Sequence, residues 1–177
     1  MTILVFRISH KLNAKIKAGP VSPLPSDENP FADWSAHLFA ADRTQYILLS
    51  NTKSLYSIVM YSKGITDERR FIERALSSLR EFMGDDGQAF VYHHFIAPAS
   101  ATVHFAKALD RTVTGCMNEL IVQATALLVG DELSEFDVGF RLNEVLLSAL
   151  AASKADKYGT PRGAFKSMAS GIAPDVA

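Results

Sequence analysis

The rest of this chain is organised around the stretch Arg111-Thr112-Val113-Thr114-Gly115-Cys116-Met117-Asn118-Glu119-Leu120-Ile121-Val122-Gln123-Ala124, which continues to Val129-Gly130. At about 100° per residue, its apolar side chains fall on one arc that is wide enough to face a core. These residues are Val113, Met117, Leu120, Ile121, Ala124, Leu127 and Leu128. The stretch therefore predicts a central helix with one buried side, on which Met117 and Leu120 lie inside the core.

A second, polar stripe runs along one edge of this arc and comprises Thr112, Cys116, Glu119 and Gln123. A packed helix holds such groups still, which suits a binding site. We therefore expect Glu119 and Gln123 to line a cleft against neighbouring strands, close to Trp34 and Asn51. The alternative is a solvated flank, which is the commoner meaning of such a stripe.

Upstream of the central helix, three strand-like runs are separated by short polar connections. The runs are Trp34–Ala41, Gln45–Ser50 and Leu55–Ser62. The connections Asp42-Arg43-Thr44 and Asn51-Thr52-Lys53 suit tight antiparallel turns, so these runs predict a three-stranded meander. Prolines between Gly19 and Pro30 exclude regular structure there and predict a surface loop.

The remaining elements are predicted from capping residues, β-branched and aromatic content, and helical spacing. Strands are expected at Ile3–Ile8, Phe90–Ile96 and Thr102–Lys107. Helices are expected after Ser9, from Thr66 or Asp67 to Gly84, and at Val145–Ala152. The segment Asp131–Leu142 forms either one helix or two tight turns.

Strands that meander locally, together with helices that do not alternate with them, indicate the α+β class. We expect a mainly antiparallel sheet made of the meander and one or two further strands. The central helix and two to four other helices cover it. Residues 1–152 are predicted to form a single domain, and residues 153–177 an irregular, partly flexible tail rich in glycine and proline.

The composition is that of a soluble globular protein. A net charge of −1, with 48% hydrophobic and 21% charged residues, provides no general attraction to nucleic acid or membranes. No run approaches the roughly 18 apolar residues of a membrane span, and no signal peptide is evident. The single cysteine, Cys116, excludes an internal disulfide and suits the cytoplasm.

Three segments together resemble an uncharacterised bacterial family that is catalogued as a domain of unknown function. They run from Ala32-Asp33-Trp34 through Arg43 to Leu55, from Arg111 to Leu120, and from Leu133 to Asn143. The resemblance extends from about Leu4 to Phe165, and its most specific part is the Gly115-Cys116-Met117-Asn118-Glu119-Leu120 block. It implies a small intracellular bacterial domain without a known activity. Leu146 stands where that family would have a proline, which favours a continuous helix over a rigid turn there.

A small anionic ligand is the candidate partner at the start of the central helix, because free N–H groups there favour phosphate or carboxylate and Arg111 lies beside them. The Asp42–Arg43 and Asp110–Arg111 pairs are either part of a site or ordinary turn formers. The full set of ligand-binding candidates is Trp34, Asp42, Arg43, Asn51, Arg111, Thr112, Glu119, Gln123 and Asn143.

No metal and no cofactor are predicted. On one strand His93 and His94 would point to opposite faces, so at most one of them could join His104 in a metal site. Glycine-rich nucleotide loops and a nucleophile elbow are absent from the sequence. Cys116 would be a nucleophile only beside a histidine.

Three functions fit these observations. The first is a non-catalytic binding or regulatory protein of the bacterial cytoplasm. The second is an enzyme that acts on an anionic small molecule, with Glu119 or Asp42 as the acid–base group beside Arg111. The third is a nucleic-acid-associated protein that uses the basic tail of Lys154, Lys157, Arg162 and Lys166, which lacks a recognisable motif. A homodimer is expected from the apolar Val145–Ala152 segment.

Overall fold

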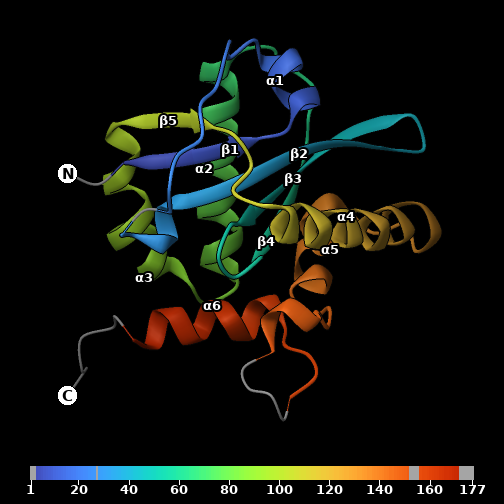
Figure 1. Ribbon diagram of the computed structural model, residues 1–177. Helices are drawn as coiled ribbons and strands as arrows, with labels where there is room; N and C mark the ends of the chain where they lie inside the picture. The colour runs from blue at the N-terminus through green and yellow to red at the C-terminus, as the bar shows by residue number, and fades with distance from the viewer. Residues whose placement is uncertain (1–2, 27, 152–155, 172–177) are drawn as a thin grey trace.

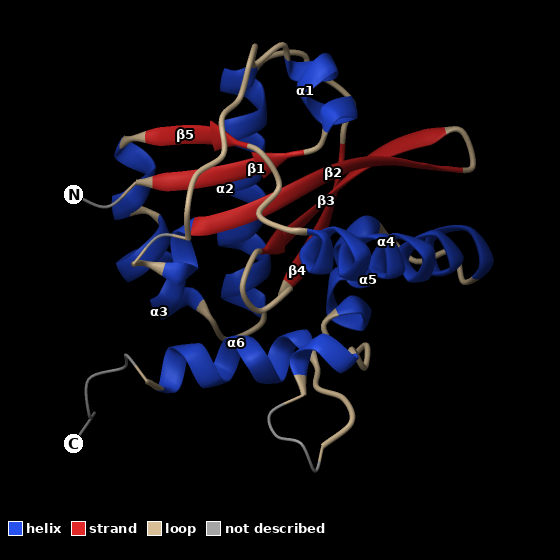
Figure 2. Cartoon of the chain, in the orientation of Figure 1, coloured by secondary structure: helices blue, strands red, loops and turns tan. Residues whose placement is uncertain are grey.

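The computed structural model describes residues 3–26, 28–151 and 156–171, which are arranged around one five-stranded sheet of order β4-β3-β2-β1-β5 (Figures 1 and 2). The strands are β1 Leu4–Ile8, β2 Asp33–Ala41, β3 Thr44–Asn51, β4 Ser57–Tyr61 and β5 Val103–Ala106. The α-helices are α1 His10–Ile16, α2 Glu68–Asp85, α3 Ala89–Val91, α4 Arg111–Thr125, α5 Glu135–Leu142 and α6 Pro161–Ser170. Shorter helical segments are η1 Pro30–Ala32, η2 Tyr92–Ile96, η3 Pro98–Ala101, η4 Ala126–Gly130 and η5 Ser148–Leu150. The α+β class is confirmed.

The predicted meander is formed by β2, β3 and β4, which pair in antiparallel order. Asp42 and Arg43 form the β2–β3 turn with positive φ angles of 47° and 66°. A two-residue hairpin turn needs such angles for its twist to match that of the two strands. The two further strands differ from the expected direction, because β1 runs parallel to both β2 and β5. The sheet is therefore mixed. Parallel neighbours require a crossover connection, and the chain makes one between β1 and β2 and another between β4 and β5.

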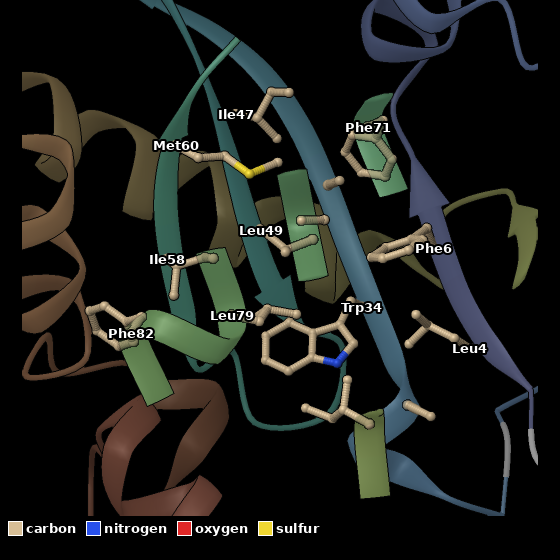
Figure 3. Packing of buried hydrophobic residues seen from close by; sticks show 14 of the residues in the cluster. Leu4, Phe6, Trp34, Ile47, Leu49, Ile58, Met60, Phe71, Leu79 and Phe82 are labelled. Atoms are coloured by element: carbon tan, nitrogen blue, oxygen red, sulfur yellow. The ribbon is translucent and has the colours of Figure 1, made fainter. Parts of the chain in front are cut away.

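The larger core lies between the sheet and α2, which Figure 1 shows behind the strands. Successive residues of a strand point to opposite faces, so alternate positions of β1 to β4 supply this core. Figure 3 shows Phe6, Trp34 and Leu49 directed toward Leu79 and Phe71 of α2. Trp34 is fully buried at the centre of this layer.

The second core lies between α4, α5 and the opposite face of the meander. Met117 and Leu120 of α4 are fully buried there and pack in one cluster with Leu48 and Val59. The prediction that these two helix residues lie inside the core is confirmed. The sheet is thus covered on both faces by helices, and the apolar spacing of α2 and α4 is visible in the sequence.

The segment Phe90–Ile96 is helical rather than a strand, so that prediction is wrong. It forms α3 and the wider turn η2, in which Val91, Tyr92 and Ile96 are buried while His93 and His94 are exposed. This helical separation of apolar and polar residues, against the core beside α2, outweighs the strand propensity of the aromatic residues.

The C-terminal region also departs from expectation. Residues 161–170 form α6 rather than an irregular tail, and the fully buried Phe165 packs against Phe31 and Tyr56. Residues 153–155 and 172–177, which were included in the predicted tail, lie outside the described residues. Val145–Ala152 was predicted as a helix, but within residues 145–151 the only helical turn is η5, and Leu147 instead bridges Gly159.

One helical segment of the described residues, Arg111–Gly130, is long and apolar enough to cross a membrane by length and composition. Apolar core helices of soluble proteins pass the same test, and this one contributes Met117 and Leu120 to a core. The arrangement around it is that of a compact soluble-type α+β fold.

Candidate functional site

The face of the sheet opposite to α2 carries a group of buried polar side chains near β1 and the start of β2. The group comprises Arg7, Asp33, Ser35 and Thr52, each of them no more than 5% exposed. They occupy this face because strand residues alternate, so their neighbours Phe6 and Trp34 point into the α2 core. Buried polar and charged groups are costly unless they are paired, so their partners determine what this group can do.

Arg7 and Asp33 form a buried two-pronged ion pair. Nε of Arg7 lies 2.9 Å from Oδ1 of Asp33, and Nη2 lies 2.8 Å from Oδ2. The other N–H groups of Arg7 donate to the carbonyl oxygens of Leu24, Pro25 and Lys107. The guanidinium therefore ties two loops to the sheet, and all five of its donors are used.

Thr52 and Ser35 extend this network by a chain of hydroxyl groups. Thr52 Oγ1 donates to Asp33 Oδ1 at 2.8 Å, and Ser35 Oγ lies 2.8 Å from Thr52 Oγ1. Because the Thr52 proton is directed to the carboxylate, Ser35 is the donor in the second bond. Arg7 thus fixes the orientation of Asp33, and Ser35 and Asp33 fix that of Thr52.

A cavity of about 340 Å³ opens above Asp33 and Thr52, and we call it the Asp33 pocket. Its lining consists of Ser26, Glu28, Pro30, Asp33, Thr52, Lys53 and Leu109. Asp33 and Thr52 form the buried floor, whereas Ser26, Glu28 and Lys53 are exposed at the rim. The pocket therefore combines a preorganised polar floor with rim groups of both charges, and such placed polar groups can fix the orientation of a small molecule.

Two other hollows lack this combination. A groove of about 380 Å³ beside β5 is larger, but its polar residues Ser22 and His104 are exposed. A cavity between β4, α2 and α5 measures about 120 Å³, too small for most organic ligands. The Asp33 pocket is therefore the candidate functional site.

Three of the residues predicted to bind a ligand are fully buried and serve the fold. Trp34 donates from Nε1 to the carbonyl oxygen of Phe31, at 2.7 Å. The side-chain amide of Asn51 donates to the Pro30 carbonyl oxygen at 2.8 Å and orders the turn after β3. Asn143 pairs with the backbone of Ser57 on β4. These contacts occupy all three side chains within the protein.

Four further candidates lie at exposed ends of elements. Asp42 and Arg43 form the tip of the β2–β3 hairpin, and Arg111 and Thr112 begin α4. The N-terminus of α4 is capped by Asp110, whose carboxylate accepts from the Val113 N–H at 2.9 Å. This negative charge occupies the place predicted for an anionic ligand, so the geometry does not support an anion site there.

The predicted cleft around Glu119 and Gln123 is not formed. Both side chains are exposed, and neither makes a hydrogen bond to the described residues of the strands. The α4 residues that face the sheet are instead Cys116, Met117, Leu120 and Ala124. Cys116 of the predicted polar stripe belongs to the buried arc. The other members, Thr112, Glu119 and Gln123, are exposed and form the solvated flank of the alternative interpretation.

The histidines and the cysteine are not gathered into a catalytic or metal site. Among the described residues, no group of three or more His, Cys, Asp or Glu side chains could hold a metal ion. His93 and His94 lie on η2 and His104 on β5, all exposed. Burial raises the pKa of the Cys116 thiol, and the carboxylates of Glu119 and Asp110 raise it further. A raised pKa disfavours the thiolate that a nucleophile requires.

The basic tail is partly absorbed into the fold. Arg162 pairs with Asp86 at 3.2 Å and with Glu144, so two carboxylates of the domain balance its positive charge. Lys157 and Lys166 are exposed, and Lys154 lies outside the described residues. The described part of the tail therefore presents fewer free positive charges than its sequence suggested.

The floor residues of the Asp33 pocket were not among the predicted site residues, although a signal for them exists. Arg7 is a charged residue inside a strand that is otherwise hydrophobic, and a buried charge requires a partner. Asp33 and Thr52 are the immediate neighbours of the predicted Trp34 and Asn51. The predicted Trp34 and Asn51 lie next to the pocket residues in sequence, but their side chains point to the other face of the sheet.

Comparison with known proteins finds one family. A family model described as a domain of unknown function (DUF6933) matches residues 5–164, a range that spans the sheet and the Asp33 pocket. No curated protein and no solved structure matches the chain.

Proposed function

The chain belongs to the DUF6933 family, a domain of unknown function, and from its geometry we propose that it is a non-catalytic domain that binds a small polar molecule. The observation that carries this proposal is the floor of the Asp33 pocket, where Asp33 and Thr52 are buried and held by Arg7 and Ser35. A floor that is ordered before the ligand arrives reduces the entropic cost of binding.

The lining suggests the chemistry of the ligand. Asp33 places a carboxylate at the floor, where its oxygens accept from Arg7 and Thr52, and Glu28 adds a second carboxylate at the rim. Lys53 supplies a cation on the same rim. These groups fit a small molecule that carries both an amino or other donor group and an anionic group, as free amino acids do. The proposal keeps the anionic ligand that was expected from the sequence, but its cationic partner is Lys53 instead of Arg111.

A non-catalytic role is supported by the hydrogen bonds that the floor groups already make to one another. Thr52 directs its proton to Asp33, and Asp33 is paired with Arg7. A general base or a nucleophile needs a lone pair that is free to act on a substrate. In this pocket the buried groups stabilise one another, which suits recognition.

We further propose a bacterial cytoplasmic setting for this binding domain. The support is the sequence resemblance described above and the single cysteine, which lies on α4 and is buried in the second core. A protein that relies on one buried thiol without a disulfide suits a reducing compartment. Fractionation of source cells, with detection of the protein in the soluble cytoplasmic fraction, tests this assignment.

The binding function is tested with a panel of the free amino acids and inorganic phosphate, by ligand-observed NMR and thermal shift. We expect at least one amino acid to bind, and expect Lys53→Gln and Glu28→Gln each to raise its dissociation constant by roughly tenfold or more. Lys11→Gln, which changes an exposed lysine on α1, is the matched control and leaves binding unchanged. Absence of binding from the whole panel, or binding that ignores both rim substitutions, would refute the proposal.

A further inference from the structure

Helix α4 and the η4 segment that continues it have a second apolar side that the rest of the described chain leaves uncovered. The exposed stripe on this side consists of Gly115, Asn118, Val122, Ala126 and Val129. Val122 on α4 is 68% exposed, and Val129 on the more widely wound η4 segment is 46% exposed, although both are β-branched hydrophobic residues. This stripe, which we call the outer α4 stripe, is separate from the buried arc of Met117 and Leu120.

The surroundings of the outer α4 stripe are also uncharged. No charged residue occurs from Leu120 to Gly130, and only 22% of the most apolar window of this helix is buried. Figure 1 shows α4 reaching outward from the sheet at one side of the molecule, and the residues of the stripe are exposed. An exposed apolar surface of this length is typical of an interface.

The spacing of the outer α4 stripe is the same in both directions from Val122. The steps are three and four residues from Gly115 to Val122, and four and three from Val122 to Val129. Within α4 the steps average 3.5 residues, the repeat at which two helices keep one seam in contact, and the π-helical η4 continues the stripe with a wider turn. An antiparallel second copy would set Gly115 opposite Val129 and Asn118 opposite Ala126, with Val122 meeting itself. The pattern is therefore complementary to its own reversed copy.

The charges at the two ends of the helix agree with the antiparallel arrangement. Arg111 is exposed at the start, and Asp131 and Glu132 are exposed just after the end. Antiparallel pairing brings Arg111 to the partner's Asp131 and Glu132 at both ends of the seam. Parallel pairing would instead place like charges side by side, which opposes that orientation.

We propose that the protein forms a homodimer in which the outer α4 stripes of two copies pack antiparallel, with the two-fold axis beside Val122. Such an interface is isologous and closes on itself, as in most homodimers. The Val145–Ala152 segment, from which self-association was first expected, does not form this surface. Val145 and Leu150 pack within the second core, and the described residues of the segment leave Leu146 as its exposed large side chain.

Sedimentation velocity over a wide concentration range tests the dimer. The wild-type chain is expected to have twice the monomer mass. Val122→Asp places two carboxylates at the centre of the seam and should raise the dissociation constant by roughly a hundredfold or more. Leu146→Asp is the matched control, because Leu146 is 64% exposed elsewhere on the surface, and its dimer should persist. A wild-type monomer at all concentrations overturns the proposal.

Cysteine cross-linking tests the orientation. In a Cys116→Ser background that retains the wild-type melting temperature, mixed Gly115→Cys and Val129→Cys chains should form a disulfide dimer under mild oxidation. Gly115→Cys alone should not, and the added side chain has room, since nothing lies within 4 Å of a Cβ built there. Cross-linking of Gly115→Cys alone would establish parallel packing and refute the arrangement. Binding of a wild-type monomer to phosphatidylcholine vesicles, lost in Val122→Asp, would assign the stripe to a lipid surface instead.

Discussion

Asn143 pairs with the backbone of Ser57 in the way that a neighbouring strand would. Its Nδ2 donates to the Ser57 carbonyl oxygen at 3.0 Å, and its Oδ1 accepts from the Ser57 N–H at 2.7 Å, across 86 positions of sequence. In the edge strand β4, Ser57 lies opposite Ser50 of β3, while the Asn51 N–H donates to the Tyr56 carbonyl oxygen, so the backbone groups of Ser57 point away from β3. The amide thereby satisfies the backbone groups of Ser57, which α5 buries at the edge of the sheet, and it anchors the end of α5 to β4.

Replacing Asn143 by Ala is expected to lower the free energy of unfolding by about 2–4 kcal/mol, because two buried backbone groups of Ser57 lose their partners. Urea denaturation followed by circular dichroism measures this change. Asn118→Ala, at an exposed position of α4, is the control and should change stability by no more than about 0.5 kcal/mol at protein concentrations where the chain is monomeric. Equal effects of the two substitutions would show that the Asn143 bonds contribute nothing specific.

The ion pair of Arg7 and Asp33 should be strongly coupled. Arg7→Met leaves the Asp33 carboxylate buried without its cation and should cost about 3–5 kcal/mol. The double variant Arg7→Met, Asp33→Leu removes both charges and should be more stable than Arg7→Met alone. A double-mutant cycle by chemical denaturation yields the coupling energy, and simple additivity of the two single changes would contradict a buried pair.

Helix α6 should contribute substantially to stability through one aromatic residue. Phe165 lies with its ring centroid 4.3 Å from that of Tyr56 and 5.4 Å from that of Phe31. Phe165→Ala empties this fully buried position and should cost about 3–5 kcal/mol. Lys166→Ala, on the exposed side of the same helix, should leave the thermal midpoint nearly unchanged. A Phe165→Ala protein as stable as the Lys166→Ala protein would mean that α6 is not docked in solution.

Cys116 should react slowly with alkylating reagents. Its raised pKa keeps the thiol protonated, so iodoacetamide should modify the folded protein at pH 8 more slowly than the denatured chain. Glu119→Gln removes one cause of the raised pKa and should accelerate the reaction, whereas Glu132→Gln should not. An unchanged rate in Glu119→Gln would contradict this electrostatic effect.

The same shift has a defined sign for stability. The folded state binds the Cys116 proton more tightly than the unfolded state does, so the contribution of this group is complete below the ordinary thiol pKa. It declines as the pH rises above about 9, the ordinary value from which the folded pKa is raised. Stability measured from pH 7 to 10 should therefore fall less steeply in a Cys116→Ala variant than in the wild-type protein.

Elements whose signal is local could be predicted from the sequence. The meander follows from strand-forming runs joined by short polar turns, and the buried side of α4 follows from apolar spacing, with Met117 and Leu120 fully buried. These features depend on residues a few positions apart, so a short window contains the physical cause. Phe90–Ile96 was misassigned because its aromatic residues favour a strand by propensity, while the core beside α2 selects a helical arrangement.

The candidate site was decided by tertiary structure. Strand alternation makes a shift of one residue equivalent to a change of face, and only the packing of α2 determined that Trp34 points inward and Asp33 toward the pocket. Arg7 satisfies its donors with a carboxylate 26 positions away and with a carbonyl group 100 positions away. The local periodicity and the α+β class could therefore be predicted without the structure. The pairing of buried polar groups depended on which distant segments the fold brings together, because a buried charge is stabilised only by partners within hydrogen-bond distance in space.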